Sequence, residues 1–147
     1  MAERPQTMEV STRGHRVHPH VADVILEAWG PGMAECFEEA AAALLGLCMD
    51  AAGASVTERW LSTIGPGSDE DMLVELLDEI LFVLDTADDV PIRVVIADRQ
   101  DVLDVVLELG DPASVTMIGS APKAIAHTGL SVERARGRVR CTFLVDV

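Results

Sequence analysis

Two Gly-Pro-Gly triplets, at 30–32 and 65–67, constrain the fold more than any other feature of the chain. The first triplet ends Val24–Trp29, where side chains of different character alternate as they do along a β-strand. The second ends Ser55–Ile64, which alternates more loosely. Gly and Pro interrupt regular structure, so each triplet predicts a turn. Apolar residues at helical spacing follow both triplets, so the fold must contain strand, turn and helix in that order at two places.

The two predicted helices differ in their polar faces. The first runs from Met33 to about Asp50, with one apolar face. The second follows Ser68, which together with Asp71 has the pattern of an N-cap and an acidic first turn. Its apolar stripe consists of Leu73, Leu76, Leu77, Ile80, Leu81 and Leu84. From Asp69 to Asp89 there are nine acidic residues and no basic residue, which describes either a solvated face or a docking surface for a basic protein.

Most of the remaining chain has the pattern of strands. The predicted strands are Gly14–His18, Pro91–Asp98, Val102–Gly110, Ala124–Glu133 and Val139–Val147. The last two form a hairpin around the turn at 136–137, whereas Ala113–Ser120 fits neither pattern. Two helices among six or so strands indicate an α+β fold, with two helices packed on a largely antiparallel or mixed β-sheet in a single domain. We expect this domain to span 13–147, after a flexible N-terminal tail at 1–12.

The composition limits the partners and the location. The net charge of −14 argues against high-affinity binding of nucleic acid by the protein alone, because such binding needs Lys and Arg to displace counterions. It suits a basic partner or a bound cation. No apolar run approaches the roughly 18 residues of a membrane span, and the N-terminus lacks the apolar core of a signal peptide. With three cysteines and no Cys-x-x-Cys motif, the chain is expected in the cytoplasm.

Asp23 is the first candidate site residue. It lies at the start of a predicted apolar strand and follows His18 and His20 in the chain. A lone Asp in this position commonly caps a turn. A buried carboxylate instead needs an ion pair, hydrogen bonds or a metal. A second carboxylate arriving from elsewhere in the chain would favour the metal.

The register of the last hairpin supplies a candidate for that second carboxylate. If the turn lies at 136–137, Glu133 faces Arg140, which is a favourable pair of opposite charges. The same register places His127 opposite Asp146, and Val147 with its terminal carboxylate follows at once. A slip of one residue would destroy these pairings.

Carboxylate oxygens suit Ca²⁺ or Mg²⁺. His20 or His127 as a ligand would favour Zn²⁺. Spacing alone does not bring Asp23 to Asp146.

Several short segments, in this order and spacing, resemble the archease family from about His20 to Val147. They are His20-Val21-Ala22-Asp23-Val24, Glu27-Ala28-Trp29-Gly30, Cys36-Phe37, Leu76-Leu77, Asp85-Thr86, Lys123-Ala124-Ile125, Gly129-Leu130-Ser131-Val132 and Leu144-Val145-Asp146-Val147. The resemblance implies a small α+β protein that is not itself an enzyme. Such a protein assists the tRNA-splicing RNA ligase by promoting its guanylylation and its multiple turnover.

The resemblance also implies a divalent cation, Ca²⁺ in the first place, with Mg²⁺ and Zn²⁺ as alternatives. Its ligands fall on Asp23, Asp146 and the terminal carboxylate of Val147. His20, His127 and Lys123 are expected near the metal or in contact with the partner.

The chain departs from the family pattern at 126–128, where Ala-His-Thr replaces Thr-Tyr-His. Two other functions stay open. One is a chaperone or binding module for a tRNA-modifying enzyme, with a purely structural metal. The other is a metal-dependent hydrolase that uses Asp23, Asp146, His20 and His127.

Overall fold

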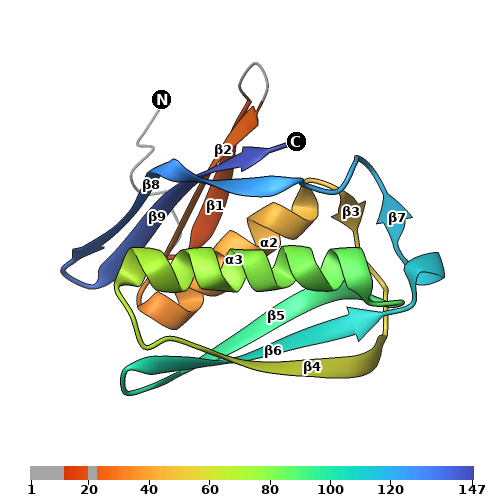
Figure 1. Ribbon diagram of the computed structural model, residues 1–147, viewed down its shortest axis with the longest axis horizontal. Helices are drawn as coiled ribbons and strands as arrows, with labels where there is room; N and C mark the ends of the chain where they lie inside the picture. The colour runs from red at the N-terminus through yellow and green to blue at the C-terminus, as the bar shows by residue number, and fades with distance from the viewer. Residues whose placement is uncertain (1–11, 20–22) are drawn as a thin grey trace, which may run out of the picture.

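The computed structural model describes residues 12–19 and 23–147. Two long helices lie among antiparallel strands (Figure 1). The elements in chain order are β1 (Gly14–Pro19), β2 (Asp23–Gly30), α2 (Met33–Gly46), β3 (Met49–Asp50), β4 (Val56–Ile64), α3 (Asp69–Thr86), β5 (Val90–Arg99), β6 (Val102–Gly110), the short 3₁₀ helix η1 (Pro112–Ser114), β7 (Thr116–Met117), β8 (Ala124–Ala135) and β9 (Arg138–Asp146). Of the predicted tail at 1–12, only Thr12 is among the described residues.

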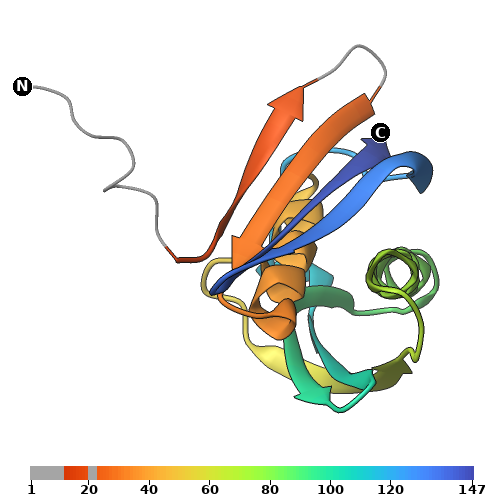
Figure 2. The same cartoon turned by 90° about the vertical axis from the view of Figure 1, so that its left-hand side faces the viewer.

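Among the residues that the structure describes, the strands form three sheets, and every pairing is antiparallel. The largest sheet has the order β1-β2-β9-β8, a second has the order β4-β6-β5, and β3 pairs with β7. Seen from the side, α2 lies between the two larger sheets, and α3 lies to one side of α2 (Figure 2). The predicted class, two helices with mostly antiparallel strands, is confirmed. Both helices contact strands of both larger sheets.

The core lies where the helices meet the sheets. Phe37 and Leu44 of α2 and Leu76 of α3 are completely buried, as are Leu26 of β2 and Phe143 of β9. Apolar side chains of β2, β4, β5, β6, β8 and β9 thus share a single core with one stripe of each long helix.

The first helix is shorter than predicted. The apolar spacing extended to about Asp50, but α2 ends at Gly46. The Cys48 carbonyl accepts hydrogen bonds from the N–H groups of Ile118 and Gly119, and β3 pairs with β7. The partner strand therefore comes from the segment that the sequence left unassigned. Pairing with this distant segment outweighs the helical spacing after Gly46.

The last hairpin has the predicted register only near its turn. Glu133 faces Arg140 as expected, but the register shifts between Ala126 and Ser131. Beyond the shift, the partner of Asp146 is Ala124 and not His127. Within the irregular segment, Gly129 has a φ of 74°, a conformation that glycine adopts readily. The predicted pair of His127 with Asp146 is wrong because a bulge interrupts the strand.

Within the part of the chain that the structure describes, no helix is long and apolar enough to cross a bilayer.

Candidate metal site

Asp23 and Asp146 lie directly opposite each other. Asp23 is the first residue of β2, Asp146 is the last residue of β9, and their Cα atoms are register partners. Opposed residues of antiparallel strands project to the same face, with Cβ atoms about 4.5–5.5 Å apart. In Figure 2 the C-terminus accordingly lies beside the start of β2. The topology thus brings together two carboxylates whose distance the sequence left open.

Burial on the opposite face of the sheet holds these two carboxylates in register. β2 and β9 pair without interruption from Asp23 with Asp146 to Gly30 with Val139. The side chains of Leu26 and Phe143 are register partners on the buried face. A slip of one residue would turn them to the surface, so the core fixes the carboxylate pair.

The two acids differ in exposure. Asp23 is half-buried, and its Oδ1 atom is excluded from solvent. It lines a cavity of about 250 Å³ together with Ile25, Thr128, Gly129, Thr142, Phe143 and Leu144. Asp146 is exposed, and its backbone carbonyl accepts a hydrogen bond from the N–H of Lys123 at 2.8 Å. The site is therefore sheltered on the Asp23 side and open on the Asp146 side.

The donor set fits a hard cation only in part. Two opposed carboxylates repel each other, which a cation between them would relieve. Across residues 12–19 and 23–147, however, no three His, Cys, Asp or Glu side chains gather in a metal-binding cluster. Ca²⁺ takes 6–8 oxygen ligands. The side chains of Asp23 and Asp146 would supply only some of these oxygens, and Val147, 43% exposed, follows directly. Further oxygens would come from backbone, water or a partner.

The other predicted site residues do not all lie here. Lys123 lies beside Asp146 through its backbone, and its side chain is exposed. His20 lies outside the described residues. His127 lies instead on a groove between α3 and β8, of about 470 Å³, which we call the acidic groove. The acidic groove is lined by Glu70, Asp71, Val74, Glu75, Asp78, His127 and Leu130.

Polar contacts tie α3 to β8 at the margin of the acidic groove. Arg134 donates two hydrogen bonds to the Asp69 carboxylate, at 2.7 and 3.0 Å. The hydrogen bond from Arg134 lowers the pKa of Asp69. Glu70 accepts a bond from the N–H of Val132 at 3.2 Å. The sequence predicted the acidic helix. The bulge that brings His127 to this helix is indicated in the sequence only by Gly129.

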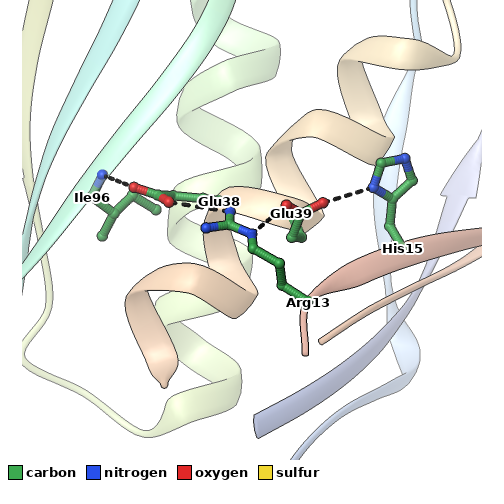
Figure 3. Close-up of polar contacts among 5 residues, drawn as sticks. All are labelled: Arg13, His15, Glu38, Glu39 and Ile96. Carbon is green, nitrogen blue, oxygen red and sulfur yellow. Dashed lines mark hydrogen bonds and ion pairs between the residues drawn. The ribbon is translucent and has the colours of Figure 1, made fainter. Parts of the chain in front are cut away.

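A second polar cluster, which the sequence did not predict, joins three elements (Figure 3). Glu39 of α2 accepts a bond from Arg13 Nε at 2.6 Å, and His15 Nδ1 of β1 lies 3.0 Å from its other oxygen. Glu38 accepts from Arg13 at 3.3 Å and from the N–H of Ile96, on the edge strand β5, at 2.7 Å. This cluster holds the two larger sheets to α2 and lines a cavity of about 710 Å³. Its partners are far apart in sequence, so no local pattern indicates it.

Residues 15–147 match a family described as the archease protein family. A protein from Mycobacterium tuberculosis named probable protein archease is 29% identical over 137 residues, which cover 93% of this chain and 76% of the relative.

Two solved structures share the fold. The solution structure of Methanobacterium thermoautotrophicum protein 1598 has a TM-score of 0.72 at 21% identity, covering 91% of this chain and 99% of that one. The crystal structure of an archease from Thermotoga maritima, described as a possible chaperone, has a TM-score of 0.64 at 22% identity, covering 87% and 93%.

Proposed function

The chain belongs to the archease family, and from this membership we propose that it binds a divalent cation and activates a tRNA-splicing RNA ligase. The observation that carries the proposal is the direct pairing of Asp23 with Asp146 at one end of the four-stranded sheet. An accessory role is in keeping with the Thermotoga maritima relative, which is described as a possible chaperone. The proposal places the protein in the cytoplasm, with its ligase partner.

We propose Ca²⁺ as the cation, held by Asp23, Asp146 and the terminal carboxylate of Val147. All three offer hard oxygen donors, which Ca²⁺ and Mg²⁺ prefer. Zn²⁺ is less well supported, because His127 lies on the acidic groove and does not face Asp146. A flexible coordination sphere completed by water or a partner suits Ca²⁺ better than the strict octahedron of Mg²⁺.

The geometry supports a contact with phosphate in the ligase. A cation held by Asp23 and Asp146 would supply positive charge that can screen phosphate oxygens. The Asp23 side of this site is half-buried, whereas Asp146 is exposed and accessible to a partner. The exposed Lys123, directly before β8, adds an ammonium group whose positive charge can pair with a phosphate group.

Ligase turnover with carboxylate variants tests this proposal. Asp23→Asn and Asp146→Asn remove charge with little change of shape, and we expect each to abolish multiple turnover while circular dichroism remains unchanged. Asp88→Asn, an exposed acid after α3, is the matched control and should activate the ligase normally. Full activation by both site variants would contradict the proposal. Turnover of a phosphoester by the protein alone would indicate a metal-dependent hydrolase instead.

The acidic groove favours a second candidate function, a binding module for a tRNA-modifying enzyme. Four carboxylates surround the apolar side chains of Val74 and Leu130, a combination that suits a basic, partly apolar segment of a protein. In this case the double variant Glu75→Lys/Asp78→Lys would abolish partner binding measured by calorimetry. Asp23→Asn would leave that binding intact, which separates the two functions.

A further inference from the structure

The outer face of the four-stranded sheet carries a cluster of arginines, away from the Asp23–Asp146 end. Arg16 of β1 is the register partner of Glu27, and Arg140 of β9 is the register partner of Trp29. Arg138 is two residues from Arg140, so it projects to the same face. We call Arg16, Arg138 and Arg140 the arginine face. These three arginines, on the two strands that flank β2, concentrate positive charge on one face of a chain of net charge −14.

On this face, the Glu27 carboxylate contacts several basic side chains. Glu27 accepts hydrogen bonds from Arg16 and Arg140, each at 3.1 Å, and His18 Nε2 lies 3.2 Å from it. The Glu27 side chain is only 14% exposed, whereas those of Arg16, His18 and Arg140 are 45–52% exposed. The Glu27 carboxylate therefore lies beneath the basic side chains. A guanidinium has five N–H donors, so each arginine bound to Glu27 retains donors for a ligand.

Trp29 orients two of the arginines. The guanidinium carbons of Arg16 and Arg138 lie 5.0 and 5.8 Å from the centre of the Trp29 ring, within cation–π range. The indole in turn lies over Gly14, where a Cβ atom would be 2.7 Å from Trp29 Cζ2. The tryptophan packs closely against the sheet and presets the arginines, which reduces the entropy lost when they bind an anion.

The net charge of the face stays positive when neighbouring residues are included. Glu133 is the register partner of Arg140 and adds one carboxylate, while Arg136 in the adjoining turn adds one further guanidinium. The arginine face therefore has three guanidinium groups against the carboxylates of Glu27 and Glu133. By contrast, Arg99 and Arg134 each form a bidentate pair with one aspartate of their own.

We propose that the arginine face binds the phosphodiester backbone of a single-stranded nucleic acid, without reading its bases. Arginines on β1 and β9, on either side of β2, suit a ligand with one negative charge at every nucleotide. Trp29 is only 7% exposed, so it provides neither an apolar anchor for a peptide nor a stacking surface for a base. The net charge of −14 keeps the affinity modest and strongly dependent on salt. This proposal rests neither on the metal nor on the ligase.

Fluorescence anisotropy with labelled single-stranded RNA and DNA of about 12 nucleotides tests the proposal, with EDTA present and no partner protein. Each neutralised phosphate contributes about −0.7 to the slope of log K against log salt, so three arginines predict a slope of about −2. Between about 50 and 200 mM salt, the affinity should fall about 20-fold. RNA and DNA should bind alike, because only phosphates are contacted.

Single variants assign the binding to the arginine face. Arg138→Gln and Arg140→Gln should each reduce the magnitude of the slope by about 0.7, whereas Arg138→Lys should retain it because the charge remains. Arg99→Gln, an exposed arginine of β5 with the same change of charge, is the matched control and should bind as the wild type. Thermal melts check that each variant is folded.

Three results would overturn the proposal. One is an unchanged salt slope in both folded arginine variants, and another is an equal loss of binding in Arg99→Gln. The third is a polyglutamate peptide that binds more tightly than RNA and is lost in the same variants, which would assign the face to an acidic protein. Because EDTA is present and no ligase is used, none of these results bears on the proposed metal site or on ligase activation.

Discussion

Asp23 and Asp146 place like charges opposite each other. Whether a substitution there stabilises or destabilises the fold therefore depends on whether a cation is bound. Without a cation, Asp146→Asn relieves the repulsion and should stabilise the fold by about 0.2–1 kcal/mol. With Ca²⁺ at about 100 times its Kd, the wild type should gain about 2.7 kcal/mol and the variant much less. Thermal unfolding in EDTA and in Ca²⁺ measures both effects.

The matched control for this measurement is Asp88→Asn, which should gain as much from Ca²⁺ as the wild type does. A wild-type melting temperature that does not respond to Ca²⁺, Mg²⁺ or Zn²⁺ would contradict the proposed metal site.

Gly14 permits the close approach of the Trp29 ring to β1. A Cβ atom at this position would lie 2.7 Å from Trp29 Cζ2, so Gly14→Ala must displace the ring or the strand. Overpacking of this kind costs about 1–3 kcal/mol. Urea unfolding should therefore give a lower free energy of unfolding for Gly14→Ala.

Gly46 in α2 is the comparison, because a Cβ atom there meets nothing within 4 Å. Gly46→Ala should be neutral or stabilising by up to about 1 kcal/mol, since alanine favours the helix. Equal destabilisation by both substitutions would rule out the steric explanation at Gly14.

At the scale of elements, the start of α3 depends on one side chain. Ser68 Oγ accepts a hydrogen bond from the N–H of Asp71 at 3.0 Å, which confirms the N-cap predicted from the sequence. Ser68→Ala leaves that N–H without its acceptor and should lower the free energy of unfolding by about 0.5–2 kcal/mol. Ser68→Asn, which can also cap, should restore most of the loss in urea unfolding. If the two variants lose the same stability, the cap contributes little.

Across the whole molecule, acidic residues hold together elements that are distant in the sequence. Burial raises the pKa of Glu39, but hydrogen bonds from His15 and Arg13 outweigh it and lower the pKa below its usual 4.5. The pKa of Glu27 is likewise lowered, by His18 and Arg140 against the effect of burial. A lowered folded-state pKa contributes stability above the unfolded pKa and loses it as the pH falls through the folded value.

The free energy of unfolding should therefore decrease as the pH falls below about 4.5, where the glutamates begin to bind protons more readily in the unfolded chain. Urea titrations between about pH 7 and 3 measure this decrease. Glu39→Gln should be less stable at pH 7 and should lose less stability on acidification. An identical pH dependence in Glu39→Gln and the wild type would contradict the assignment to Glu39.

The sequence by itself determined the local structure. Alternation predicted β2 and β4, helical spacing predicted α2 and α3, and Ser68 marked the start of α3. These features depend on side chains a few residues apart, so a local pattern contains them. The hairpin register was correct near its turn for the same reason.

Only the tertiary structure decided how distant segments meet. The pairing of Asp23 with Asp146 joins the two ends of the domain, and it arises because β2 and β9 bury their apolar faces together. Pairing with β7 fixes the end of α2, and a bulge near Gly129 moves His127 from Asp146 to the acidic groove. The free energy of such contacts comes from surfaces that form only when the core assembles, so no local stretch of sequence records them.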